Sequence, residues 1–268
     1  MSSTSLDHEL VAALKRLRLG RIATTLAERL VLAEKQTMGY EDFLLLLLTD
    51  EIARREASAT DNRVREAALD PEMRLELWDK TAKVSFDKRL LGALTSLRFL
   101  EEHKHVVVLG SVGVGKTFLA TALGHAAIRR RRSVHFERCD RLLKRLRASR
   151  LDNSHEVEIR KLLRVDLLII DDFALQPLDP LDTADIYELI VERHRTASTV
   201  ITSNREPVEW LGLMADPLLA QSAIDRLQSA AHELVLDGES YRQRQKPTTS
   251  DPGVDDPPAR PRSSRRRT

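Results

Sequence analysis

The feature that most constrains this chain is an apolar run that breaks into a glycine-rich loop and resumes as a helix. The run covers residues 106–109, and the loop that follows reads Gly110, Ser111, Val112, Gly113, Val114, Gly115, Lys116 and Thr117. Apolar pairs then recur at helical spacing, beginning with Phe118 and Leu119. The segment therefore has both the G-x-x-x-x-G-K-T spacing and the strand–loop–helix context of a P-loop.

The chemistry of such a loop is phosphate binding. Its glycines let backbone N–H groups turn inward around phosphate oxygens, and the N-terminus of the following helix adds a dipole that favours anions. We expect Lys116 to reach the β- and γ-phosphates and Thr117 to ligate Mg²⁺. The alternative is a glycine-rich turn that binds nothing, and the motif and its context together disfavour it. The loop therefore predicts a site for a nucleoside triphosphate.

Length and composition suit one α/β core with a smaller appendage. The chain has 268 residues, 42% of them hydrophobic, and no apolar run is long enough to span a bilayer. The N-terminus lacks the pattern of a signal peptide. Cys139 is the only cysteine, which excludes intrachain disulfides and cysteine-rich metal clusters. We expect a cytoplasmic protein that does not associate with membranes.

The order of periodic segments predicts four parts. Residues 1–70 read as a small all-α domain that binds DNA or a partner, or that merely packs on the ATPase domain, and residues 71–89 read as a linker. Residues 90–242 alternate apolar strands with helices, which predicts an α/β ATPase domain with a mostly parallel sheet covered on both faces. Residues 243–268 hold five of the ten prolines and predict a disordered basic tail. The five expected strands are 105–109, 133–136, 167–170, 199–202 and 233–236.

Polar side chains follow two of these strands. Asp171 and Asp172 come directly after strand 167–170, and Asn204 follows strand 199–202. Mg²⁺ favours carboxylate oxygens, so Asp171 is the candidate metal ligand and Asp172 the candidate general base. Asn204 could hydrogen-bond the γ-phosphate or the attacking water. Adjacent acids and an asparagine also suit simple polar turns, but their position downstream of a P-loop favours the catalytic interpretation.

An arginine near the end of a predicted helix is a further candidate. Arg226 follows apolar positions at helical spacing, and an arginine at a subunit boundary could neutralise charge on a neighbour's γ-phosphate. The alternative is a surface arginine on a solvated helix.

These segments together resemble a known family. The P-loop, strand 167–172 and the stretch 202–205 are similar to AAA+ ATPases of the helicase-loader clade, to which the DnaC-like proteins belong. The closer resemblance is to the IstB-like helper ATPases of bacterial insertion sequences. It rests on residues 202–210, 223–227 and 238–242, and on the opening 14–19. It extends over nearly all of the chain except the tail.

The resemblance implies an ATP- and Mg²⁺-dependent ATPase that assembles on duplex DNA as a ring or spiral and stimulates a transposase of the same element. It implies that Asp171 and Asp172 occupy the Walker B positions, Asn204 the sensor position, and Arg226 the trans-acting finger. Glutamate is commoner where Asp172 stands, so hydrolysis is expected to be slow. No room remains after Arg226 for a separate lid domain, and Arg242 is a candidate second sensor.

The charge distribution is compatible with a nucleic-acid partner. Net charge is only +2, yet residues 129–150 hold ten Lys and Arg against Glu137 and Asp140. We hypothesise that Lys144, Arg145 and Arg147 contact phosphates, although residues 129–132 also suit a helix C-terminus.

Two other functions remain open from the sequence. One is a DnaC-like loader that remodels a replicative helicase, and the other is a nucleotide-binding module without turnover. A neighbouring transposase gene would favour transposition, and a neighbouring replication gene cluster would favour helicase loading. DNA-stimulated phosphate release would exclude a nucleotide-binding module without turnover.

Overall fold

The chain folds around a twisted sheet of six strands in the order β1-β6-β2-β5-β4-β3. The structure is a computed structural model that describes residues 7–79, 81 and 83–241. Strands β2 to β6 pair in parallel, and β1 runs antiparallel to β6. The strands are β1 (Val84–Ser85), β2 (His105–Gly110), β3 (Val134–Arg138), β4 (Leu167–Asp171), β5 (Ser198–Ser203) and β6 (Ala231–Gly238). This is the α/β fold of a P-loop NTPase, as the sequence predicts.

The expected strand count was wrong by one. All five expected parallel strands are present as β2 to β6, but β1 adds an antiparallel edge within the segment expected to be a linker. Its pairing of Val84 with Gly238 joins the start of the sheet to its last strand. Two residues are too few for an alternating apolar pattern, so periodicity does not reveal this strand.

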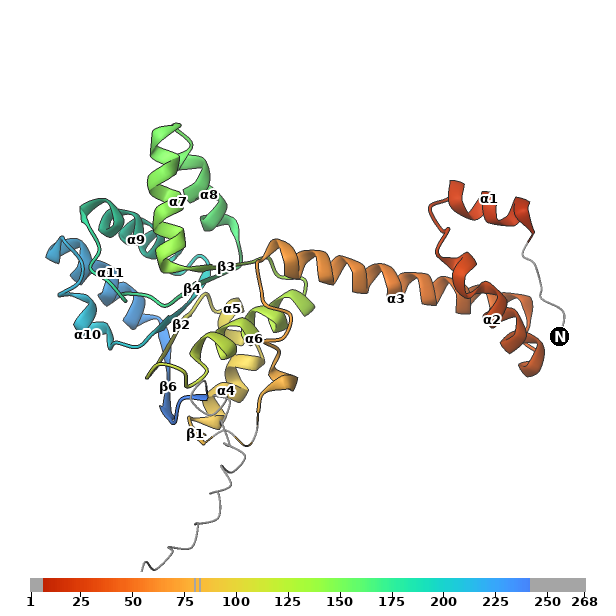
Figure 1. The fold of residues 1–268 in the computed structure, drawn as a ribbon, viewed down its shortest axis with the longest axis horizontal. Coiled ribbons are helices and arrows are strands. Elements are labelled where there is room, and N and C mark those ends of the chain that lie inside the picture. The colour runs from red at the N-terminus through yellow and green to blue at the C-terminus, as the bar shows by residue number, and fades with distance from the viewer. Residues whose placement is uncertain (1–6, 80, 82, 242–268) are drawn as a thin grey trace, which may run out of the picture.

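Helices cover both faces of the sheet, as Figure 1 shows. The end of α3, with α4, α5 and α6, packs on one face, and α7 to α11 contribute to the core on the other. Their bounds are α4 (Lys88–Thr95), α5 (Arg98–Glu101), α6 (Lys116–Arg129), α7 (Cys139–Leu151), α8 (His155–Arg164), α9 (Pro180–Arg193), α10 (Pro207–Trp210) and α11 (Pro217–Ser229), with a 3₁₀ turn η1 at Leu75–Leu77.

Alternate residues of the central strands supply the two cores. Val107 and Ile201 point into the core beneath α7 to α11, whereas Val106 and Val200 point into the core beneath α6. Successive side chains of a strand face opposite sides of a sheet, so a strand covered on both faces must be apolar throughout. This double burial explains the uninterrupted apolar runs of the sequence.

The N-terminal helices form a tip at the end of a long shaft. They are α1 (His8–Arg16), α2 (Ile22–Gln36) and α3 (Tyr40–Glu66). The third helix has 27 residues, and at 1.5 Å per residue it is about 40 Å long. It projects away from the sheet and carries α1 and α2 near its far end (Figure 1). The second half of α3 is mostly polar and charged, which is typical of a helix that bridges two parts of a protein through solvent.

The joint between α3 and the sheet is closely packed. The backbone N–H of Phe136 on β3 donates to the carbonyl of Ala67 over 2.9 Å, and His125 Nε2 lies 2.8 Å from the carbonyl of Asp70. Leu69 lies against Gly124 of α6, where an added Cβ would come within 3.1 Å of its methyl carbons. These contacts determine where α3 leaves the α/β domain.

Among the described helices, none is long and apolar enough to cross a membrane. The expected disordered tail at 243–268, together with Arg242, lies outside the described residues.

A buried histidine at the start of β2 makes stability depend on pH. His105 is fully buried, and its Nδ1 accepts the backbone N–H of Thr199 over 3.1 Å. Burial first, and then the charges of Arg193 and His194, lower the pKa of His105 from 6.5 to about 4. In the unfolded chain His105 is therefore protonated below pH 6.5, whereas in the folded chain it is protonated only below about pH 4.

We predict that His105 destabilises the fold as pH falls from 6.5 toward 4. From pH 7.5 to pH 5, the free energy of unfolding should fall by about 2 kcal/mol more in the wild type than in His105→Gln. Glutamine can still accept the Thr199 N–H but does not titrate. Denaturant unfolding of both proteins at the two pH values measures the difference, and equal falls would contradict the prediction.

Candidate nucleotide-binding site

The glycine-rich loop joins the end of β2 to the start of α6 and forms the floor of a cavity. Gly113 and Gly115 have φ values of +87° and +101°, a region that side chains disfavour. The cavity has a volume of about 320 Å³. It is lined by Met73, Leu77, Trp78, Asp79, Val84, Val112, Gly113, Val114, Gly115, Lys116, Thr117, Phe118, Asp172, Leu175, Asn204 and Tyr241. Residues from distant parts of the sequence therefore meet around the loop.

The lysine of the loop is folded over the loop itself. Lys116 Nζ donates to the carbonyl oxygens of Gly110 and Ser111, each over 2.8 Å, and its residue is 7% exposed. Phosphate oxygens could replace these neutral acceptors with charge-assisted hydrogen bonds, which are about twice as strong. The ammonium group is therefore held against the loop, in the lining of the cavity that would receive the phosphates.

The carboxylate of Asp171 is the centre of the polar network beneath the loop. Thr117 Oγ1 lies 2.9 Å from Asp171 Oδ1, and Thr202 Oγ1 donates to the same oxygen over 2.6 Å. Burial raises the pKa of the Asp171 carboxyl above its ordinary value, against the hydrogen bonds from Thr202 and Thr117. A bound cation would favour the ionised carboxylate.

The donor set at Asp171 fits Mg²⁺ rather than a metal held by the protein alone. A buried carboxylate beside a threonine hydroxyl provides hard oxygen ligands. In the part of the chain that the structure describes, no group of three or more His, Cys, Asp and Glu side chains could hold an ion. Mg²⁺ at this place would therefore complete its coordination with phosphate oxygens and water.

Asp172 and Asn204 reach the cavity from neighbouring strands. Strands β4 and β5 lie side by side, with Ile170 paired with Ile201. Asp172 has φ of 55°, and its backbone N–H donates to Thr202 Oγ1 over 3.0 Å. Its Oδ2 lies 3.7 Å from Nε of Arg138, at the end of β3. The proposed base is therefore paired with a cation in this arrangement.

Arg226 does not join this cavity. It lies on α11 beside a separate surface hollow with His194 and Leu218, and its guanidinium donates to the backbone carbonyl and the hydroxyl of Ser222. The structure thus brings together the loop, Asp171, Asp172 and Asn204, but leaves Arg226 elsewhere on the same chain.

Comparison with known proteins identifies the family. The family model described as IstB-like ATP binding protein matches residues 12–249. The chain belongs to this family. A putative ATP-binding protein in an insertion sequence of Mycobacterium tuberculosis (strain ATCC 25618 / H37Rv) is 39% identical over 91% of this chain and 98% of its own length. The "Insertion sequence IS21 putative ATP-binding protein" of Pseudomonas aeruginosa is 31% identical over 89% of this chain and 90% of its own.

Solved structures share the fold of this IstB-like chain at low sequence identity. DnaI matches with a TM-score of 0.53 at 19% identity, covering 63% of this chain and 94% of its own. Domain III of the Thermotoga maritima replication initiation protein DnaA matches with a TM-score of 0.51 at 21% identity, covering 64% and 68%. At this identity the likeness concerns the fold alone.

Two residues that line the cavity of this IstB-like chain, Trp78 and Tyr241, were not predicted from the sequence. Trp78, from the expected linker, lies over Gly115, where an added Cβ would come within 2.7 Å of the indole. It also makes an edge contact with Phe118 at a centroid distance of 5.3 Å. On the other side, the backbone N–H of Tyr241 donates to the carbonyl of Gly113 over 2.9 Å. A tryptophan in a segment expected to be only a linker was the available signal.

The third missed residue is Thr202. The sequence places it at the end of a strand, where a threonine suits β structure and suggests no role. In the fold its hydroxyl donates to Asp171 and accepts the N–H of Asp172. One side chain thus positions both acids.

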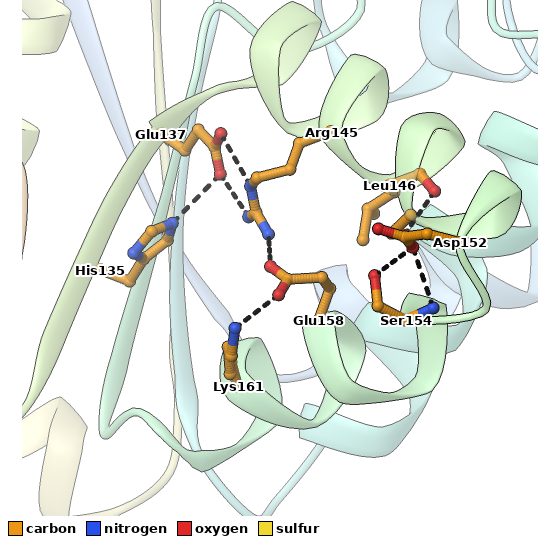
Figure 2. A network of polar contacts seen from close by, with 9 residues as sticks. His135, Glu137, Arg145, Leu146, Asp152, Ser154, Glu158 and Lys161 are labelled. Carbon is orange, nitrogen blue, oxygen red and sulfur yellow. Dashed lines mark hydrogen bonds and ion pairs between the residues drawn. The ribbon is translucent and has the colours of Figure 1, made fainter.

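The basic segment 129–150 is largely engaged within the molecule. Arg145 of α7 bridges Glu137 on β3 and Glu158 on α8, and Figure 2 shows its guanidinium enclosed between the two carboxylates. Although burial raises it, hydrogen bonds from His135 and Arg145 lower the pKa of Glu137 to about 2.

Arg147 likewise donates to Asp182 of α9 over 2.8 Å. The hypothesis that Arg145 and Arg147 contact phosphates therefore finds no support in the structure, because both stabilise the packing of α7. Lys144 is exposed on the same helix.

We predict that Thr202→Val will weaken Mg²⁺-dependent nucleotide binding by about tenfold or more, because hydrogen bonds to charged groups contribute about 1.5–3 kcal/mol. Thr202→Ser keeps the hydroxyl and should retain most of the affinity. Calorimetric titration with ATP, with and without Mg²⁺, measures the effect. If valine and serine behave alike, the hydroxyl does not position Asp171.

Proposed function

We propose that this chain is the ATP-hydrolysing helper of an insertion sequence, which assembles on duplex DNA and stimulates the transposase of the same element. The observation that carries this proposal is the meeting of Lys116, Thr117, Asp171, Asp172 and Asn204 at one cavity. The insertion-sequence context of the relatives supports the biological setting.

The phosphate end of the cavity suits ATP with Mg²⁺. Lys116, which now donates to loop carbonyls, would bind the β- and γ-phosphate oxygens, and Thr117 and Asp171 would hold the metal. Mg²⁺ supplies neutralisation of the charge that develops on the phosphates. Asn204 hydrogen-bonds the γ-phosphate or the water, and Asp172 orients that water and accepts its proton.

The apolar part of the cavity lining suits a purine base. Met73, Leu77, Trp78 and Tyr241 give it an apolar and aromatic lining. Stacking on aromatic side chains contributes about 1–3 kcal/mol per base in proteins that bind single-stranded nucleic acids. The base is therefore held mainly by stacking, and Trp78 is placed to report nucleotide binding through its fluorescence.

Slow turnover follows from the position of Asp172. Its carboxylate is one methylene shorter than the commoner glutamate, and its Oδ2 lies 3.7 Å from the guanidinium of Arg138. The shorter side chain and its pairing with Arg138 should both keep hydrolysis slow.

Assembly would complete the site. Arg226 lies outside its own cavity, so it can act only on the nucleotide of a neighbouring subunit. Leu218 in the same hollow is 81% exposed, which suits an interface between subunits in a ring or spiral. Duplex DNA is the partner on which these subunits assemble, with Lys144 as a phosphate contact.

The DnaC-like loader function raised by the sequence receives no residue-level support. The solved relatives that could suggest it are similar in fold alone. A transposase partner agrees better with the insertion-sequence relatives.

The proposed function predicts phosphate release that duplex DNA and the element's transposase increase. Lys116→Ala should lower ATP affinity about a hundredfold or more, because a buried charge-assisted contact is lost, and should abolish this release. Lys88→Ala, an exposed lysine at the start of α4, is the matched control and should behave as the wild type. Stimulation by a replicative helicase but not by the transposase would contradict the proposal.

A second prediction concerns the arginine supplied in trans. Arg226→Ala and Asp172→Asn should each bind ATP but hydrolyse it poorly. Mixing them should restore part of the DNA-stimulated phosphate release, since the Asp172→Asn subunits supply Arg226 to intact neighbouring sites. A mixture as inactive as its components would rule out the trans role.

A further inference from the structure

The surface hollow beside Arg226 contains a histidine that the proposed function does not use. His194 directly follows α9 and lines this hollow of about 610 Å³ together with Leu218 and Arg226 of α11. The residue is half-buried, and its Nδ1 is a buried atom without a hydrogen-bond partner in the described part of the chain. Buried polar atoms without partners are uncommon in proteins, so the placement of this imidazole needs a physical reason.

The backbone that leads into His194 is fixed by a fully buried arginine. Arg193 is 1% exposed, and its guanidinium donates to the carbonyl of Leu162 over 2.7 Å and to that of Val165 over 3.0 Å. It also donates to the carbonyl of Ser198 at the start of β5. These hydrogen bonds join the end of α9 to the end of α8 and to the sheet. The imidazole of His194 therefore extends from a rigid base.

On one side the ring of His194 lies beside His105, at the start of the strand that leads to the phosphate-binding loop. The two ring centroids are 6.2 Å apart, and the ring planes are inclined by 32°. His105 Nδ1 accepts the backbone N–H of Thr199, which fixes the orientation of the His105 ring. His105 is fully buried, so it forms an immobile wall on this side of His194.

On the other side His194 makes a hydrogen bond with the backbone of Arg226. Burial first, and then the charges of Arg195 and Arg226, lower the pKa of His194, whereas this hydrogen bond raises it, as a bond to a carbonyl oxygen does. The ring is therefore neutral at neutral pH. Because Nδ1 has no partner among the described residues, the proton that the ring donates is on Nε2. The imidazole thus joins the end of α9 to the turn of α11 that carries Arg226.

We propose that His194 is a positioning residue for Arg226, which it holds in place to act on the nucleotide of a neighbouring subunit. The imidazole lies between His105 and the Arg226 backbone, so it sets how far this turn of α11 stands from the sheet. The Arg226 guanidinium is folded back onto Ser222 of its own helix and must extend from there to reach a neighbour. A fixed backbone leaves only the side chain to be ordered on assembly. This inference rests on the proposed trans-acting role of Arg226.

DNA-stimulated phosphate release tests the assignment. His194→Ala should bind ATP like the wild type, as Trp78 fluorescence reports, but should release phosphate at least about tenfold more slowly, because a small misplacement of a reacting group can cost about a hundredfold. His194→Gln keeps an N–H donor near the place of Nε2 and should retain most of the rate. Glu192→Ala is the matched control, since Glu192 is exposed on α9, and it should behave like the wild type.

Mixtures of variants identify the subunit on which His194 acts. With Asp172→Asn, His194→Ala should recover part of the rate, because the Asp172→Asn subunits present Arg226 correctly to intact neighbouring sites. With Arg226→Ala it should recover nothing, because neither kind of subunit then presents this arginine. Any other pattern would overturn the proposal. In particular, rescue by Arg226→Ala but not by Asp172→Asn would mean that His194 supports the site of its own subunit.

The single variants separate this inference from the proposed function. If Arg226→Ala is slow but His194→Ala is as fast as the wild type, or His194→Gln is as slow as His194→Ala, the positioning role is wrong and the trans-acting role of Arg226 stands. Loss of ATP binding in His194→Ala would indicate a general structural role and would also overturn the inference. A wild-type rate in Arg226→Ala would overturn both proposals.

Discussion

The hydrogen bonds to the buried carboxylate of Asp171 join the three elements on which the site depends. Thr117 brings the start of α6, Asp171 ends β4, and Thr202 lies near the end of β5. Moving α6 or β5 would remove one of the two hydroxyl groups that hydrogen-bond this buried carboxylate, and such a loss costs about 1–3 kcal/mol. The positions of Lys116, Asp172 and Asn204 follow from this junction, because each is at most two residues away along the chain.

The same junction explains how the site can respond to its surroundings. Asp172 is held by its backbone N–H to Thr202, while its carboxylate lies near Arg138 at the end of the edge strand β3. The phosphate-binding loop is in turn contacted by Trp78 before the sheet and by Tyr241 after it. Movements of α7, of the segment before β1 or of the turn after β6 would therefore reach the reacting groups directly.

The molecule separates this chemistry from its N-terminal helices. A shaft of 27 residues joins the tip to the α/β domain through Ala67, Leu69 and Gly124. The surface hollow at Arg226 lies on α11, apart from these N-terminal helices.

Local periodicity and a motif of contiguous residues were enough to predict the five parallel strands, the helices between them and the loop with Lys116. They also placed Asp171 and Asn204 at strand ends, where the strand order brings them together. The positions of Trp78, Tyr241 and Thr202 emerged only from the folded chain, since their contacts join segments far apart in the sequence. The pairing of Arg145 with Glu137 and Glu158 emerged in the same way, because a sequence reveals charges but not which opposite charges they meet.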